Sequence, residues 1–154
     1  MEPDLDLFRR GPDILAEAIA GVTEEESRFV AVPGKWTIRQ LARHVTDTEI
    51  VLGVWFRQMI AEKRPLMGMW DQDAWAAGLD YNECDPFDSA AKFRILRDDT
   101  SAILDKLPAE AFERVGLHPA RGAATLGEWV TRLGKHIEKH AGHIQRNREI
   151  WSQR

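Results

Sequence analysis

Apolar side chains recur at alternating intervals of three and four residues along four long stretches of the chain. This spacing is the period of a helix that turns one face toward a core. The first stretch runs from about Pro12, and Leu5 and Phe8 continue its pattern upstream. Because proline inside a helix costs ~3 kcal/mol, we expect Gly11 and Pro12 to set these two residues apart as a short leading turn. The apolar positions of the helix itself are Leu15, Ile19 and Val22.

The second and fourth helices each begin with a capping box, in which a threonine and a side chain three residues later satisfy two free backbone N–H groups. Thr37 and Gln40 form one box, and Thr125 and Glu128 form the other. Each box therefore fixes the start of its helix. The second helix then repeats Ile38, Leu41, Val45, Thr48, Leu52, Trp55 and Met59, and the fourth repeats Leu126, Val130, Leu133, Ile137, His140, Ile144 and Trp151.

A third helix lies between these two, and we expect Pro108 to end it. Before it, residues 63–88 form a connection too long for a minimal bundle turn, and such a crossover lets consecutive helices run parallel. Residues 116–124 form a second irregular stretch, and no strand alternation appears anywhere. The pattern predicts one all-α domain over residues 1–154, a four-helix bundle with a long crossover between helices two and three. The apolar positions of the third helix are Phe93, Leu96, Thr100, Ile103 and Leu107.

Composition and charge narrow the classes of function. The 25 acidic and 21 basic side chains are interspersed, so no basic stripe could neutralise nucleic acid. No apolar run approaches the ~20 residues of a membrane span, and no signal-peptide pattern opens the sequence. The single cysteine, Cys84, excludes an intrachain disulfide. We therefore expect a cytoplasmic protein. Six tryptophans against one tyrosine indicate a pocket or an interface lined by indoles, with filling of the core as the alternative.

His136 and His140 lie four residues apart on the fourth helix, so their rings project from one face about one turn apart. Such a pair converges on one ion without distorting a helix, although it is a weak signal alone. His140 also occupies a position in the apolar pattern, where an unpartnered imidazole costs about 1–3 kcal/mol. A hydrogen bond to a carbonyl or carboxylate would satisfy the ring. A metal would do so too, with His44 on the second helix as the third donor.

Two further histidines bear on this assignment. His143 follows His140 by three residues and shares nearly the same helix face as His136. Because His136 and His143 are two turns, about 10 Å, apart, both cannot easily bind the same ion. His143 is therefore a ligand only if His136 is not, or else it faces the substrate or supports the ligands. His118 lies in a loop beside Pro119, and we expect it at the surface.

Three blocks of the sequence occur together in order. Residues 33–49 read PGKWTIRQLARHVTDTE, residues 71–81 read DQDAWAAGLDY, and residues 136–145 read HIEKHAGHIQ. These blocks resemble the second helix, the crossover loop and the HxxxHxxQI ending of the DinB-like and YfiT-like family of metal-binding four-helix bundles. One departure is His143, which stands where the family often has glutamine. The residues that match are His44, Asp47, Glu49, Trp75, Tyr81, His136 and His140.

The resemblance implies an up-down-down-up bundle in which His44, His136 and His140 hold one divalent metal ion, with water in at least one remaining position. We further expect His143 and Trp75 to contact a cofactor or substrate. Members of the family resemble metal-dependent hydrolases or enzymes that use a low-molecular-weight thiol. Analogy also implies a homodimer, for which bundle faces that carry large aromatic side chains are candidates. These side chains are Trp55, Phe56 and Trp151.

Three neutral imidazoles leave a metal with its full charge and an open position, as in catalytic zinc sites. We therefore expect an enzyme with a small-molecule substrate, with zinc or nickel as the metal. Transfer of a low-molecular-weight thiol is preferred over hydrolysis of a small ester or amide, and a non-catalytic, stress-associated metal-binding module is the third reading. Glu49, just over one turn past His44, is the candidate general base or ligand-orienting residue, with a solvated or capping glutamate as the alternative.

Overall fold

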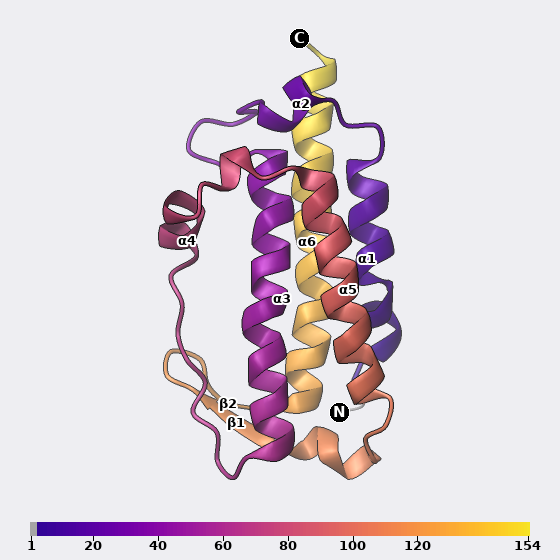
Figure 1. The fold of residues 1–154 in the computed structure, drawn as a ribbon, viewed down its shortest axis with the longest axis vertical. Coiled ribbons are helices and arrows are strands. Elements are labelled where there is room, and N and C mark those ends of the chain that lie inside the picture. Colours follow the sequence, from indigo (N-terminus) through magenta and orange to yellow (C-terminus); the bar gives the residue numbers. More distant parts are fainter. Residues whose placement is uncertain (1–2) are drawn as a thin grey trace.

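Four long helices form the body of the molecule in the computed structural model, which describes residues 3–154. They are α1 (Leu5–Ile19), α3 (Ile38–Ala61), α5 (Pro86–Leu104) and α6 (Leu126–Ser152). Figure 1 shows these helices running up, down, down and up, with the crossover returning from the lower end of α3 to the upper end of α5. The predicted all-α bundle and its topology are confirmed.

Both predicted capping boxes are present. Thr37 Oγ1 accepts the N–H of Gln40 at 3.3 Å, and Gln40 Oε1 accepts the N–H of Thr37 at 2.9 Å. The corresponding distances for Thr125 and Glu128 are 3.1 and 2.7 Å. Each box satisfies two of the four N–H groups that a helix start leaves free. The helices that carry the histidines therefore begin where the sequence predicts.

Helix α1 is continuous, so the predicted leading turn before Pro12 is wrong. Pro12 has no N–H to donate to the carbonyl of Phe8, four residues earlier. Arg97 of α5 supplies the missing donor, because its Nη1 lies 2.6 Å from the Phe8 oxygen. Gly11 permits this approach, since a Cβ there would lie 2.5 Å from Arg97 Nη1. The Gly-Pro pair is the docking site of a buried arginine and not a helix boundary.

Helix α5 ends at Leu104, so Leu107, predicted as its last apolar position, lies beyond it. Arg97 is only 1% exposed, whereas Leu96 and Ile103 are half-buried. A charged side chain thus occupies the buried face of the helix, and the apolar stripe is rotated relative to the predicted one. The reason is the ion pair that Arg97 forms inside the bundle, which the apolar pattern alone does not reveal.

A two-stranded antiparallel sheet occupies most of the stretch 116–124, so the expectation of no strands is wrong. Its strands are β1 (Val115–His118) and β2 (Gly122–Thr125). Leu117 also pairs with the crossover, donating its N–H to the Pro65 oxygen at 3.1 Å. Such short strands, rich in glycine and alanine, carry little of the alternation by which strands are predicted.

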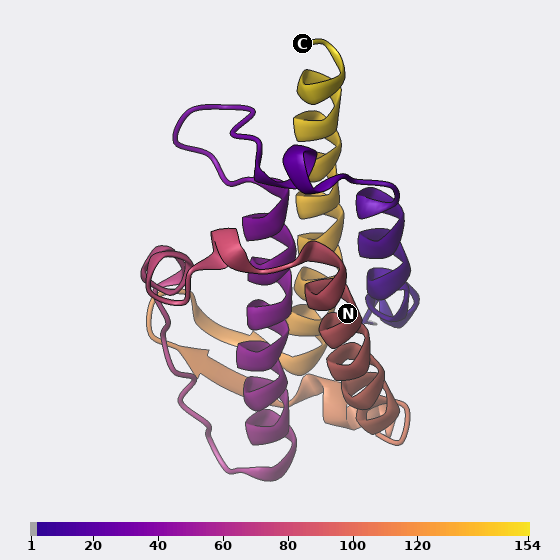
Figure 2. The same cartoon turned by 45° about the horizontal axis from the view of Figure 1, so that its top comes forward.

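The crossover and the sheet lie on one flank of the bundle. Figures 1 and 2 both show α4 (Gln72–Gly78) and the hairpin beside α3, on the side away from α1. Along residues 3–154, no helix is long and apolar enough to cross a membrane. The remaining elements are α2 (Glu24–Arg28) and two 3-10 turns, η1 (Tyr81–Glu83) and η2 (Ala109–Glu113).

The predicted homodimer stays a prediction, but two of the residues considered for its interface are unsuitable. Trp55 is 5% exposed and Phe56 is 1% exposed, and both pack in the core. Their side chains therefore cannot form an interface between two copies of the chain. Trp151 is half-buried and packs edge-on against Phe29, with ring centroids 5.3 Å apart.

Among the described residues, the apolar core consists of two clusters, and each long helix contributes to both. Phe8, Leu52, Leu104 and Leu133 belong to one cluster, and Leu15, Val45, Phe93 and Ile137 belong to the other. At the junction, α3 carries four consecutive buried polar residues, Thr46 to Glu49. The bundle therefore contains a polar junction inside its core, and the candidate site is built beside it.

Candidate metal centre

Three histidines from two helices converge at one point. His44 comes from α3, and His136 and His140 come from successive turns of α6. The Nε2 atom of His136 lies 3.1 Å from that of His44 and 3.0 Å from that of His140. His44 and His140 are only 2% and 6% exposed. Within residues 3–154, these three form the one group of histidine, cysteine or carboxylate side chains close enough to share an ion.

Hydrogen bonds alone cannot satisfy this arrangement. A ring nitrogen of a neutral imidazole carries either one hydrogen or one lone pair, so His136 Nε2 cannot make two good hydrogen bonds to its neighbours. A cation would instead accept all three lone pairs. In a tetrahedral zinc site with Zn–N distances of ~2.0–2.1 Å, two ligand nitrogens are about 3.3 Å apart. The observed separations of 3.0 and 3.1 Å are close to this value, so the three residues fit a metal ion.

Burial holds the three imidazoles in the neutral form that a metal requires. Burial, and to a lesser degree Lys139, lowers the pKa of His44 to about 4. Burial also lowers the pKa of His136 to about 3 and that of His140 to about 2, and in both cases a neighbouring histidine adds to the effect. Near neutral pH the three rings therefore present lone pairs and not positive charges.

Aromatic rings, and not a hydrogen bond at Nδ1, orient His44 from the side away from the other histidines. Its Nδ1 is buried without a hydrogen-bond partner among the described residues, and the same is true of His140. The His44 ring packs 4.7 Å from Trp36 and stacks on Trp70 at 5.8 Å, with an interplanar angle of 14°. Trp75 packs edge-on against Trp70 at 4.8 Å. Trp75, predicted to bind a cofactor, thus supports the indole that covers a histidine.

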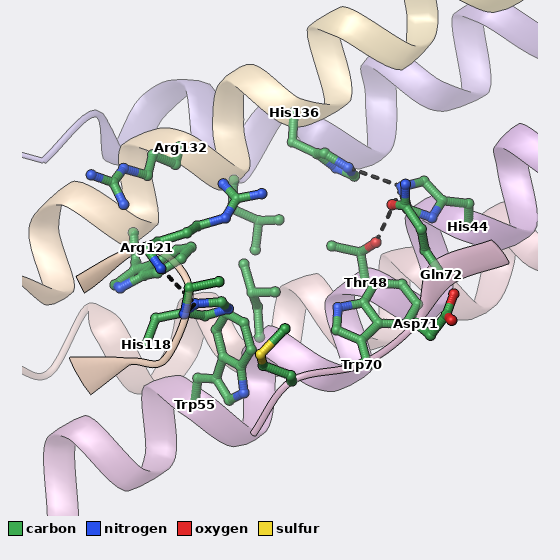
Figure 3. Close-up of a pocket in the computed structure, with 15 residues that line it drawn as sticks. His44, Thr48, Trp55, Trp70, Asp71, Gln72, His118, Arg121, Arg132 and His136 are labelled. Carbon is green, nitrogen blue, oxygen red and sulfur yellow. Dashed lines mark hydrogen bonds between the residues drawn. The ribbon is translucent and has the colours of Figure 1, made fainter. Parts of the chain in front are cut away.

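A pocket of about 750 Å³ opens beside the histidines, a size typical of small-molecule sites. Figure 3 shows His44, His136 and Thr48 at one end, and His118, Arg121 and Arg132 at the other. The Thr48 hydroxyl lies 3.5 Å from His44 Nε2. The remaining residues of the lining are Leu52, Trp55, Met69, Trp70, Asp71, Gln72, Ala120, Trp129 and Leu133.

Glu49, the candidate general base, is not brought together with the histidines. Its two carboxylate oxygens accept hydrogen bonds from Arg97 Nε at 2.9 Å and Arg97 Nη2 at 2.8 Å. Both side chains are 1% exposed, and neither lines the pocket. The pairing occupies the carboxylate that general-base catalysis would need. The solvated glutamate weighed as its alternative is wrong, because Glu49 is a buried ion-pair partner.

Asp47 and Tyr81, two further residues of the matching blocks, tie the crossover to α3. The Tyr81 hydroxyl donates to Asp47 Oδ2 at 2.6 Å, and Arg43 forms an ion pair with the same aspartate at 3.0 Å. Burial raises the pKa of Tyr81 above its usual range, and the hydrogen bond to Asp47 adds to this effect. The crossover that carries Trp70 is therefore fixed against the helix that carries His44.

The two remaining histidines, His143 and His118, differ from expectation in their exposure to solvent. His143 is exposed, and its ring packs 5.4 Å from that of His140, outside the cluster of Nε2 atoms. His136, the rival of His143, occupies the third position in that cluster. His118, expected at the surface, is 7% exposed and lines the pocket. The hairpin folds it inward, and sequence analysis missed the hairpin.

Several pocket residues carried a weak sequence signal or none. The excess of tryptophan indicated a lined pocket, and Trp55, Trp70 and Trp129 do line it. Nothing in the sequence singled out Arg121 or Arg132, since isolated arginines are usually solvated. Their position depends on the hairpin and on the face of α6.

Comparisons with known proteins find a matching family and several similar proteins. Residues 7–144 match the sequence pattern of the DinB superfamily. YfiT of Bacillus subtilis is 27% identical over 141 residues, which are 91% of this chain and 79% of YfiT. A protein of Bacillus licheniformis is 26% identical over 143 residues, which are 92% of this chain and 81% of that protein. Both bear the name "putative metal-dependent hydrolase".

A solved structure is also similar. The Bacillus subtilis YfiT structure superposes with a TM-score of 0.82 at 25% identity, covering 97% of this chain and 84% of that one. It is described as a probable metal-dependent hydrolase with an unusual four-helix bundle topology. The thiol transfer preferred from the sequence stays a prediction, and so does the choice of zinc or nickel.

Proposed function

The chain belongs to the DinB superfamily, and we propose that it is a metal-dependent hydrolase of a small ester or amide, with His44, His136 and His140 as the metal ligands. The observation that carries this proposal is the convergence of the Nε2 atoms of two buried histidines and one half-buried histidine at one end of a pocket large enough for a small molecule. The names of the relatives support the reaction class.

The ligand set favours catalysis over a purely structural role. Structural zinc sites close the coordination shell with four protein ligands, whereas catalytic sites use three and leave a position open. When bound, such a metal polarises a carbonyl oxygen and lowers the pKa of water toward ~7. Beside it, the Thr48 hydroxyl and the amide of Gln72 line the pocket as polar groups that could orient a substrate.

The protein supplies positioning at this end of the pocket and not a carboxylate base. Among the residues that line it, Asp71 is the one acid, and its Oδ1 accepts the N–H groups of Asp73 and Ala74 at the start of α4. Trp70 covers His44 and limits the access of water from the crossover side. We therefore assign the chain's own residues to binding, orientation and exclusion of water.

The test uses metal-free protein reloaded with zinc, nickel, manganese or iron, each at one equivalent. Release of nitrophenol or nitroaniline from nitrophenyl esters and anilides is measured for each form, beside conjugation of monochlorobimane to cysteine or glutathione. We expect metal-dependent hydrolysis that chelation removes and metal restores, and that His140→Ala lacks.

Two outcomes would contradict the proposal. Metal-dependent conjugation of a thiol without hydrolysis would support the transferase. Stoichiometric metal binding with no turnover in either assay would support a non-catalytic binding module. Metal content is measured on the same samples, so that a failure of loading is distinguished from a failure of chemistry.

A further inference from the structure

The end of the pocket remote from the histidines is lined by hydrogen-bond donors. Arg121 and His118 reach it from the hairpin, and Arg132 and Trp129 reach it from α6. Figure 3 shows Arg121, Arg132 and His118 gathered at the same end of the pocket, away from His44 and His136. The indole Nε1 of Trp129 is buried and lacks an acceptor in the described part of the chain. This end therefore offers several donors to whatever occupies it.

His118 contributes a donor because of its tautomer. Its Nδ1 accepts the backbone N–H groups of Ala120 and Arg121, both at 3.1 Å. The proton of the neutral ring must then be on Nε2, which makes that atom a donor. Burial, and to a lesser degree Arg121, lowers the pKa of His118, so the ring stays neutral near pH 7. The same two contacts fix the turn from which the Arg121 side chain extends.

The two arginines bring positive charge without a paired carboxylate. Within residues 3–154, neither Arg121 nor Arg132 forms an ion pair, whereas Arg94 and Arg148 each do. Glu128 lies one turn before Arg132 and is influenced by its charge, but its carboxylate is used in the capping box with Thr125. The Arg132 guanidinium instead packs 4.9 Å from the centre of the Trp129 ring. Both charges are available to a ligand.

We propose that this end is an anion subsite, in which Arg121, Arg132 and His118 bind a carboxylate or phosphate group of the substrate, remote from the bond that is broken. A guanidinium matches the geometry of either oxyanion. Leu52 on α3 and Leu133 on α6 lie between the subsite and the histidines along their helices, so the middle of the pocket is apolar. The substrate class is thus an anionic small molecule with an apolar body. The assignment of its far end to the bond-breaking site rests on the proposed function.

The experiment measures binding to metal-free protein, so that an oxyanion cannot ligate a metal. Quenching of tryptophan fluorescence is titrated with 4-phenylbutyrate, with its neutral counterpart 4-phenylbutyramide and with 3-phenylpropyl phosphate. We expect at least one of the anions to bind about tenfold more tightly than the amide, because its hydrogen bonds are charge-assisted. The tighter of the two anions identifies the oxyanion.

Arg121→Gln and Arg132→Gln are each expected to weaken anion binding about three- to tenfold while leaving amide binding unchanged. Arg10→Gln removes the same charge from the exposed face of α1 and serves as the matched control, with no change expected. Equal affinities for anions and amide, binding of none of the probes, or an anion preference that survives both arginine substitutions would overturn the subsite. Since the assay involves neither metal nor turnover, its result is independent of whether hydrolysis is found.

Discussion

Glu49 and His44 project from the same helix within two turns of each other and are 1% and 2% exposed, yet their surroundings differ completely. Glu49 is closed off, because Arg97 donates to both of its oxygens and also to the Phe8 carbonyl. The Arg97 guanidinium lies over the ring of Phe8 at 3.9 Å. His44 meets two other imidazoles, and their Nε2 atoms converge.

The difference separates a structural polar cluster from a functional one. In the glutamate–arginine cluster, each carboxylate oxygen has a partner inside the protein, and both side chains are buried outside the pocket, so a ligand cannot reach them. The three-histidine cluster has neutral rings whose nitrogens cannot all be satisfied by one another. Burial of a polar side chain therefore does not by itself indicate function. The deciding property is whether other residues of the protein supply all of its hydrogen-bond partners.

The largest expected effect is a loss of stability when the Glu49 carboxylate is removed from its pairing with Arg97. Glu49→Ala should lower the free energy of unfolding by about 3–5 kcal/mol, because it leaves the Arg97 charge buried and unpaired. Urea denaturation of metal-free protein measures this loss, with Glu17→Ala on the exposed face of α1 as the control.

If Glu49→Ala does not fold, Glu49→Gln provides the same comparison, since the amide oxygen retains one of the two acceptors. Unchanged stability together with a selective loss of activity would contradict the structural role and restore Glu49 as a base.

The second largest effect should be a gain of stability when a metal binds the three clustered histidines. A metal that binds only the folded protein stabilises it by about 2.7 kcal/mol at a free concentration of one hundred times Kd. We expect this rise on adding zinc to wild-type protein and none in His140→Ala, with unfolding followed by circular dichroism. A comparable rise in His140→Ala would contradict the role of His140.

Gly11→Ala tests the close approach of the Arg97 side chain to the backbone of α1. The added Cβ would lie 2.5 Å from Arg97 Nη1, and overpacking of this kind costs about 1–3 kcal/mol. Gly142→Ala on α6 is the matched control, because no atom outside its own stretch of helix backbone lies within 4 Å of its Cβ position. The control should gain about 0.5–1 kcal/mol from helix propensity, so the two substitutions have opposite signs. A stabilising Gly11→Ala would show that Arg97 does not need the glycine.

The smallest effect is on the pH dependence of the metal-free protein. The folded-state pKa of His140 is lowered to about 2, below the ordinary value of 6.5. Between these values the unfolded chain binds the proton and the folded one does not, so stability falls as pH falls below about 6.5. Each such histidine contributes about 1.4 kcal/mol per pH unit. His140→Ala should have a shallower slope by about this amount, and an unchanged slope would contradict its burial as a neutral ring.

Sequence patterns predicted the parts of this molecule that depend on local periodicity. The capped starts of α3 and α6, the long crossover and the four helices follow from spacing and from side chains close in sequence. A histidine within an apolar stripe is unusual, so the sequence alone singles out His140. These features are local, and one helix at a time suffices to predict them.

The features that sequence analysis missed depend on partners far apart in the chain. Pro12 suggested a break because its replacement donor, Arg97, lies on another helix. Glu49 resembled a catalytic acid for the same reason, since the arginine that pairs with it is 48 positions away. His118 and Arg121 reach the pocket only because a short hairpin pairs with the crossover. Long-range pairing of charges and backbone leaves no periodic signal in the sequence.

The central claim is that His44, His136 and His140 together hold one metal ion. It is tested most directly by the metal content and zinc affinity of four single alanine variants, with His143→Ala as the matched control from the same helix. We predict one metal per chain in the wild type and in His143→Ala, and loss of stoichiometric binding when any of the three clustered histidines is replaced. Full binding by His136→Ala, or its loss in His143→Ala, would contradict the account.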